Sequence, residues 1–280
     1  MSVAHVQPIE NDQAALVAAR YGAAHAPVLA PTNDVLRTIL GHRSVRAYLP
    51  RALPAGTLEM LVAAAQSAAT SSNLQAWSVI AVEDAGRKAR LAKVATNQAH
   101  IVQCPLLLVF LADLSRLARV GAAHGRHLEG LDYLEAFIVA AVDAALAAQN
   151  AVVALESLGL GSVYIGALRN DPEAVAGELG LPPHVMAVFG LCVGYEDQAH
   201  PAAIKPRLSQ SAVLHRERYD AGDDATVAAY DTTLGDFSRA QEMAETDWTG
   251  RVMARVGTVA AMNGRDRMTG ILNRLGFALK

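Results

Sequence analysis

Hydrophobic residues along the chain fall into short uninterrupted runs and into longer stretches with helical spacing. Short apolar runs bounded by turns or charges predict buried strands. Four such runs are Trp77 to Val82, Leu106 to Ala112, Ser162 to Ile165 and Val185 to Val193. Helical patterns alternate with them irregularly, so the sequence predicts an α+β fold.

The longest helical pattern, Asp132 to Ser157, is apolar on nearly all faces and contains no glycine or proline. It predicts a long buried central helix that ends near Gly159. The stretch is apolar enough to suggest a membrane span, but Asp143 and three further polar residues interrupt it. Because an ionisable residue in mid-span costs about 2.5–3.5 kcal/mol, we expect a core helix and no membrane association.

Other helices are expected near residues 13–21, 54–68, 171–179, 226–237 and 252–262. No internal repeat, low-complexity tract or flexible linker divides the chain. We therefore predict an N-terminal extension over residues 1–30 and one main domain over residues 31–280. A polar, proline-punctuated excursion is expected within that domain at about residues 197–250.

Composition narrows the class of protein. The chain has 280 residues, 52% of them hydrophobic, and a formal net charge of -3. Without an overall basic field, sequence-independent nucleic-acid binding has little electrostatic support. The N-terminal residues lack a cationic segment followed by an apolar one, so we expect a cytoplasmic protein. Cys104 and Cys192 each lie in an apolar run, which is typical of buried hydrophobic cysteines and not of a metal site.

Local cation clusters are more informative than the net charge. His42-Arg43-Ser44-Val45-Arg46 places two guanidinium groups three residues apart, on one side of a helix or turn. The planar fork of arginine suits phosphate, so an anion pocket is one interpretation. A solvated charged turn is the other, and the pentapeptide alone favours it.

A second basic segment is Ile204 to Leu208, where Lys205 and Arg207 flank a proline. In an extended segment both side chains point to one side, as for a second anion site, although an exposed basic loop fits too. Between the clusters, Thr70 to Trp77 carries small hydrogen-bonding side chains that could equally mark a loop. Gly159 to Arg169 lacks G-x-G-x-x-G spacing, so a Rossmann dinucleotide site is not supported.

Taken together, these segments resemble the nitroreductase family of FMN-dependent NAD(P)H oxidoreductases. The closest branch is that of oxygen-insensitive nitroreductases and NADPH-flavin oxidoreductases. The resemblance starts near Leu36 and is carried by GHRSVR, ATSSNLQAWSVI, VDAALAAQNAVVALESLGLGSVYIGALRN, FGLCVGY, KPRL and the late Asp-Trp pair. It implies a mostly antiparallel sheet flanked by helices, and an intertwined homodimer whose two subunits build each FMN site.

The resemblance also implies the residues that hold FMN. The phosphate and ribityl end would contact His42, Arg43, Ser44 and Arg46. The flavin ring would be lined from the partner subunit by Thr70, Ser71 and Ser72, and its edge would meet Gln98. The backbone beside the isoalloxazine would come from Tyr164, Ile165, Gly166 and Ala167, the last usually glycine in the family. The pyrimidine side and the phosphate would be reached by Lys205 and Arg207, respectively.

The implied reaction is ping-pong. NAD(P)H reduces FMN and leaves, and a nitroaromatic, quinone or free flavin then takes the electrons at the same site. No side-chain acid or base is needed for the first half, and Lys205 would stabilise negative charge on the reduced ring. Two alternatives stay open: a flavin-binding or interaction protein without turnover, and a specialised member with one natural substrate.

One segment departs from the family pattern. Where this branch commonly carries arginines for the NADPH 2'-phosphate, the stretch Arg239 to Trp248 has acidic residues and alanine. Carboxylates there would repel a phosphate and could accept a ribose hydroxyl. The sequence therefore argues against strict NADPH use and leaves NADH or dual use open.

Overall fold

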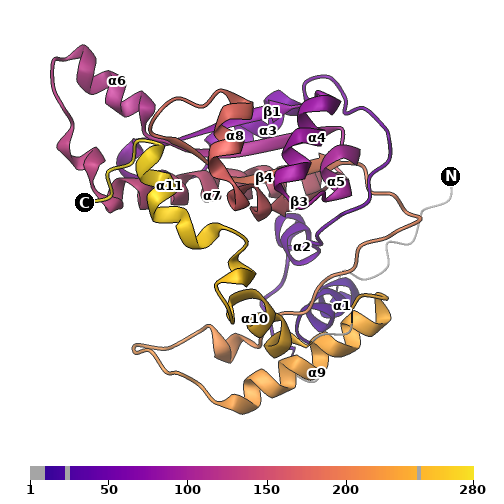
Figure 1. The fold of residues 1–280 in the computed structure, drawn as a ribbon. Helices are drawn as coiled ribbons and strands as arrows, with labels where there is room; N and C mark the ends of the chain where they lie inside the picture. The colour runs from indigo at the N-terminus through magenta and orange to yellow at the C-terminus, as the bar shows by residue number, and fades with distance from the viewer. Residues whose placement is uncertain (1–9, 23–25, 245–246) are drawn as a thin grey trace. The chain divides into compact units, whose positions relative to one another are not determined.

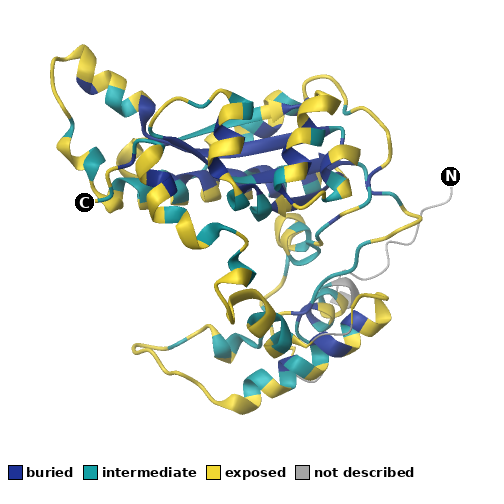
Figure 2. Ribbon diagram, in the orientation of Figure 1, coloured by how far each residue is buried: buried dark blue, intermediate teal, exposed yellow. Residues whose placement is uncertain are grey.

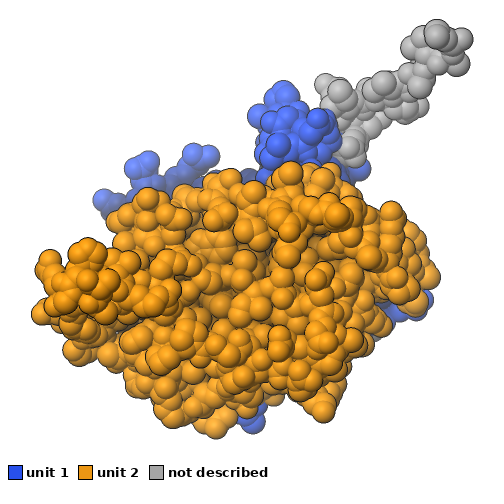
Figure 3. Space-filling view, turned by 90° about the horizontal axis from the view of Figure 1, so that it is seen from above, with its two compact units in different colours: residues 1–43, 202–261 blue, residues 44–201, 262–280 orange. Residues whose placement is uncertain are grey.

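The computed structural model describes residues 10–22, 26–244 and 247–280 (Figure 1). These residues form two compact units (Figure 3). The first comprises Met1–Arg43 and Ala202–Ala261, and the second Ser44–Pro201 and Met262–Lys280. Most of the predicted excursion, like the predicted N-terminal extension, belongs to the first unit.

The second unit is built on a four-stranded antiparallel sheet with the order β1-β2-β4-β3. Its strands are β1 (Trp77–Val82), β2 (Leu106–Asp113), β3 (Gly161–Ile165) and β4 (Val185–Gly194). Each agrees with a predicted strand to within one residue at either end. The predicted α+β class and antiparallel sheet are therefore confirmed.

Helices cover both faces of this sheet. The helices of this unit are α3 (Thr57–Gln66), α4 (Ala85–Val94), α5 (Ala99–Gln103), α6 (Ser115–Ala123), α7 (Leu134–Ser157), α8 (Pro172–Leu179) and α11 (Met268–Arg274), of which α7 and α8 pack directly against strands. Alternate residues of β2, such as Leu108 and Phe110, pack with α3 and α7 in one apolar cluster. Every residue of β2 is buried, so its other side chains are covered on the opposite face, where α8 packs against β4 (Figure 2).

The predicted central helix forms as α7, but only part of its surface is buried. By length and composition alone it could cross a membrane. We interpret it as a core helix because one side packs against α3 and the sheet. Its opposite side exposes an apolar stripe of Leu134, Ile138, Val142 and Leu146, which are 46, 46, 50 and 43% exposed. The predicted long central helix is therefore confirmed, and part of its apolar surface is exposed in this chain by itself.

The first unit contains α1 (Glu10–Tyr21), α2 (Asp34–Leu40), α9 (Asp224–Ala240) and α10 (Trp248–Val256). Tyr230 on α9 is buried, and its hydroxyl donates to the Pro206 carbonyl at 2.9 Å. The Tyr230 and Trp248 rings pack edge to face, with 6.0 Å between their centroids. The helix predicted at 252–262 instead begins at Trp248 and stops before Gly257. A Cβ at Gly257 would lie 2.4 Å from the Met253 carbonyl oxygen, so glycine permits this tight helix end.

Candidate functional site

The segment after α2 is fixed along the edge strand of the sheet. In the second unit, Ser44 forms a parallel bridge with Ser162, and the Val45 amide donates to the Ser162 carbonyl at 2.9 Å. A Cβ at Gly161 would lie 2.5 Å from Val45 Cγ2. Only glycine therefore lets this segment pack so closely on β3.

The Arg46 side chain is exposed at this edge, and its guanidinium donates to the Ser44 carbonyl at 3.3 Å. The pKa of His100 is lowered, first by burial of its imidazole and second by the positive charge of Arg46. A ring nitrogen of His100 lies 3.0 Å from the Gln98 side-chain oxygen. His100 thus contacts Gln98 and is also within range of the Arg46 charge, while the assignment of both residues to a cofactor site stays a prediction.

The end of β3 presents the predicted backbone segment. Tyr164 is 36% exposed, and its hydroxyl donates to the Gln149 side-chain oxygen at 3.3 Å. Its ring packs edge to face on Phe189, with 5.1 Å between the ring centroids. Burial, and then the nearby Glu156 charge, raise the pKa of Tyr164. Ile165 is buried, whereas Gly166 and Ala167 begin a short 3-10 helix that is half-buried. The Tyr164 phenol therefore stays protonated and the following backbone comes to the surface.

The loop that begins at Thr70 is held by a buried carboxylate on α7. Asp143, 2% exposed, accepts hydrogen bonds from the Thr70 hydroxyl at 2.6 Å and from the Ser71 and Ala76 amides at 3.1 Å each. Asp143 is therefore a buried helix acid whose partners lie in this loop. Because the Thr70 hydroxyl is committed to Asp143, the exposed side chains of this group are those of Ser71 and Ser72.

The same loop stores backbone strain. Ser72, Asn73 and Gln75 adopt left-handed conformations with φ of 48, 55 and 50°. Such conformations are unfavourable for residues with a Cβ and persist where the surroundings impose them, which is common at binding sites. A pocket of about 530 Å³, lined by residues that include Asn73, Gln75 and Arg116, adjoins the loop.

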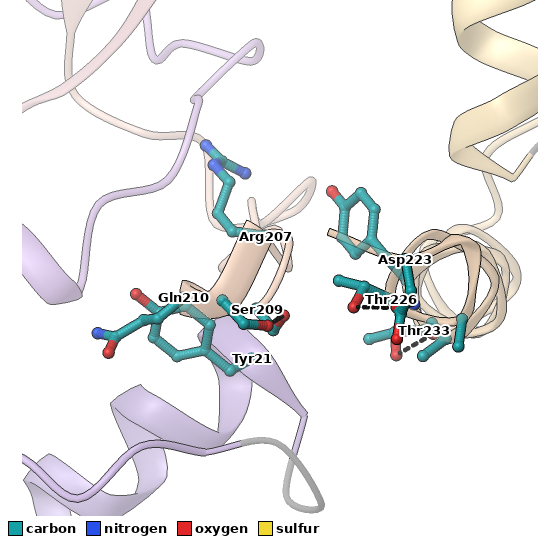
Figure 4. A pocket seen from close by; sticks show the side chains of 11 residues that line it. Tyr21, Arg207, Ser209, Gln210, Asp223, Thr226 and Thr233 are labelled. Carbon is teal, nitrogen blue, oxygen red and sulfur yellow. Dashed lines mark hydrogen bonds between the residues drawn. The ribbon is translucent and has the colours of Figure 1, made fainter. Parts of the chain in front are cut away.

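In the first unit, the second basic segment borders a pocket of about 410 Å³ (Figure 4). Arg207 is exposed on its rim and donates to the carbonyls of Lys205 and Pro206 at 3.1 Å each. Figure 4 shows Tyr21, Ser209 and Gln210 on one side of the pocket and side chains of α9 on the other. Arg207 is thus part of a hollow surface, whereas Lys205 is half-buried.

One residue of this region escaped the sequence analysis. Arg20, at the end of α1, is only 8% exposed, and its guanidinium donates to carbonyls of both basic segments. A single arginine in a helix carries no sequence signal for such a role, because its partners are backbone atoms distant in the sequence.

The predicted site residues fall into separate groups in one chain. Ser44, Arg46, Gln98 and the end of β3 belong together in the second unit, while the Thr70 loop is bonded to α7. His42, Arg43, Lys205 and Arg207 belong to the first unit. Of the predicted nucleotide-selective stretch, Glu245 and Thr246 lie outside the described residues.

Comparison with known proteins identifies the family of the chain. A model described as the nitroreductase family matches residues 39–195, and one described as its C-terminal domain matches residues 205–280. The chain belongs to the nitroreductase family. It is 40% identical over 230 residues to FMN reductase (NADPH) of Bacillus subtilis, covering 79% of this chain and 90% of that protein.

Two further relatives extend the comparison. Oxygen-insensitive NADPH nitroreductase of Salmonella typhimurium is 36% identical over 214 residues, covering 75% of this chain and 83% of that protein. The solved structure of B. megaterium NfrA2 has a TM-score of 0.83 and 36% identity, covering 89% of this chain and all of the other. The predicted family and branch are confirmed.

Proposed function

We propose that the protein is an FMN-dependent NAD(P)H oxidoreductase that passes electrons to small acceptors such as nitroaromatics, quinones or free flavin. The names of the relatives support this class of enzyme. Within the chain, the observation that carries it is the Ser44 to Arg46 segment fixed along β3 beside Gln98. A phosphate-binding segment is thereby coupled to a strand end that can accept a flat ring.

The side chains present fit the phosphate of FMN. Arg43, Arg46 and Arg207 are exposed, so their guanidinium groups reach the surface, and guanidinium binds phosphate oxygens in pairs. His42 and Ser44 add hydrogen-bonding groups in the same segment. We assign these residues to the phosphate and ribityl end of the cofactor.

For the ring, we assign the Tyr164 to Ala167 backbone, with Gln98 at the flavin edge and Lys205 at the pyrimidine side. Bound FMN supplies the hydride chemistry. The Lys205 ammonium would favour the negative charge that reduction places on the pyrimidine. Because no protein acid or base is required for hydride transfer to the ring, this chain's residues bind and orient donor and acceptor in turn.

We propose a homodimer whose partner subunit supplies Thr70, Ser71 and Ser72 to each site. The apolar stripe on α7 supports this proposal. Its four large side chains recur every four residues along a 24-residue helix and so expose a continuous apolar surface. Sedimentation should give a dimer. Val142→Glu, which puts a charge in the stripe, should give monomers that retain less FMN, whereas Glu135→Gln on the same helix should stay dimeric. A monomeric wild-type protein would contradict the assembly.

The nucleotide donor is proposed to be NADH or NADPH without strong selectivity. Glu242 stands in the stretch where a phosphate-binding arginine is common in this branch, and a carboxylate disfavours a 2'-phosphate. Steady-state rates with each nucleotide test this. A large preference for NADPH, as the relatives' names suggest for those proteins, would refute it.

The decisive experiment is a visible spectrum of the purified protein, with the released cofactor identified by chromatography. Stoichiometric FMN should bleach with NADH or NADPH under anaerobic conditions and recover with an added quinone. FMN that does not bleach would indicate a binding protein without turnover, and a colourless protein that takes up no FMN would refute the proposal. Turnover with a single acceptor among many would favour the specialised alternative.

Lys205→Ala should lower both the affinity for FMN and its midpoint potential, because the ammonium that stabilises the reduced ring is gone. A potentiometric titration and a binding titration measure the two effects. Lys93→Ala, on the exposed side of α4, is the matched control and should change neither. An unchanged potential in Lys205→Ala would remove this role from Lys205.

A cytoplasmic location is proposed on the basis of NAD(P)H use and the two buried free cysteines, which are typical of a reducing compartment. Cell fractionation tests it.

A further inference from the structure

The end of helix α1 joins two stretches of the first unit, Leu40 to His42 and Lys205 to Arg207. From its buried position, the Arg20 guanidinium donates to the Lys205 carbonyl at 2.8 Å through one terminal nitrogen. The other nitrogen donates to the carbonyls of Leu40 at 3.0 Å and His42 at 2.8 Å. One side chain therefore holds residues that lie about 160 positions apart in the sequence.

The Arg20 backbone takes part as well. Its carbonyl accepts the Arg207 amide at 2.8 Å, so both the side chain and the main chain of Arg20 contact the Lys205 to Arg207 segment. Leu40 ends α2, and its carbonyl is one of the groups that a helix leaves unpaired. A cation at that end also interacts favourably with the helix dipole.

These contacts suit a positioning role. Guanidinium presents five donors in a rigid fork, so it can bind carbonyls from two segments at once, which a lysine ammonium on its flexible stem does less well. All the Arg20 acceptors named here are backbone oxygens, so the basic side chains of these segments are not its partners in those bonds. α1 also precedes both family matches, which begin at residues 39 and 205.

We infer that Arg20 is a positioning residue that sets the backbone of the His42 and Lys205 segments for cofactor binding. This rests on the proposed FMN site. Helix α1 thereby contributes to cofactor binding, because it fixes the backbone of these two segments before FMN binds. Preorganisation of this kind raises affinity by lowering the ordering required on binding.

The test uses full-length protein with Arg20→Lys, which keeps the charge but not the fork, and Arg20→Gln as a second variant. We expect both to weaken FMN binding by about tenfold or more, since every 1.4 kcal/mol of lost preorganisation is a factor of ten. Arg255→Lys is the matched control, because Arg255 donates to the Ala261 carbonyl at 3.0 Å in the same unit. It should bind FMN like the wild type.

A double-mutant cycle separates positioning from general stability. If Arg20 acts through Lys205, Arg20→Lys should lower the FMN midpoint potential in the wild type and leave it unchanged in the Lys205→Ala background. Equal shifts in both backgrounds, or wild-type affinity and potential in both Arg20 variants, would overturn the inference. A wild-type protein that binds no FMN would instead refute the proposed function, so the two failures are distinguishable.

Discussion

The two compact units are stabilised in different ways. The second encloses a sheet whose central strand β2 is buried along its whole length between helices. Among the described residues of the first, the buried hydrophobic side chains are Val17, Tyr230 and Leu234. Polar contacts join its helices instead, including the Thr249 hydroxyl and amide on Asp231 at 2.6 and 2.8 Å.

This difference indicates that the sheet unit is stabilised mainly by apolar burial and the first unit mainly by hydrogen bonds. Apolar burial is non-directional and makes the sheet unit a stable frame. Hydrogen bonds are directional and fix where a backbone lies, at a smaller net stabilisation of about 0.5–1.5 kcal/mol each. The first unit, which carries His42, Arg43 and the Lys205 to Arg207 segment, therefore depends on a few specific contacts for its geometry.

The largest effect is expected in the sheet unit. Phe110→Ala removes a ring that is 1% exposed and packs against Trp77 and Phe189 at 6.1 and 5.9 Å. The loss of burial and the cavity should cost about 3–5 kcal/mol of unfolding free energy. Denaturant unfolding measures it, with Met60→Ala, at an exposed position of α3, as the control. A loss of unfolding free energy as small as that of Met60→Ala would contradict the view that apolar burial stabilises the sheet unit.

A smaller effect is expected where the sheet unit itself uses polar contacts. Asp143→Asn keeps the shape but supplies one acceptor oxygen in place of two, so a buried donor of the Thr70 loop loses its partner. We expect about 1–3 kcal/mol of destabilisation and faster proteolysis within the loop. Glu135→Gln makes the same chemical change at an exposed position of the same helix. If both variants unfold alike, Asp143 does not hold the loop.

The smallest effect is expected in the first unit. Tyr230→Phe keeps the ring but deprives the Pro206 carbonyl of its donor, which should cost about 0.5–1.5 kcal/mol. Unfolding monitored by Trp248 fluorescence suits the measurement, because that ring contacts Tyr230. Tyr219→Phe, at a position that is 82% exposed, should leave stability unchanged. A loss above that of Asp143→Asn would show that this unit depends on single bonds more than the sheet unit does.

The strands and most helices followed from the sequence because each depends on neighbouring residues. The apolar runs at 77–82 and 185–193 form strands in almost any compact context, and Asp171 before Pro172 begins α8 as a local cap. The expectation of burial was wrong for 77–82, because β1 lies at the edge of the sheet and is mostly half-buried. The ends of α10 were predicted wrongly although their signals are also local: a side-chain cap from Asp247 starts the helix and Gly257 stops it.

The candidate site could be predicted only in part. GHRSVR and KPR are local patterns of charge, so their chemistry was visible, as was the family resemblance that links them. Three features depend on residues far apart in sequence: Gly161 packing against Val45, Asp143 holding the Thr70 loop, and Arg20 joining the basic segments.

The sequence by itself determined the periodicity of the elements, the apolar character of the strands and the charge of the candidate phosphate segments. These properties depend on side-chain chemistry and short-range spacing. Only the tertiary structure decided which backbone carbonyls Arg20 binds, which loop Asp143 holds and which side of α7 stays exposed. The physical reason is that such contacts form between groups that only the folded chain brings within hydrogen-bonding distance or leaves uncovered.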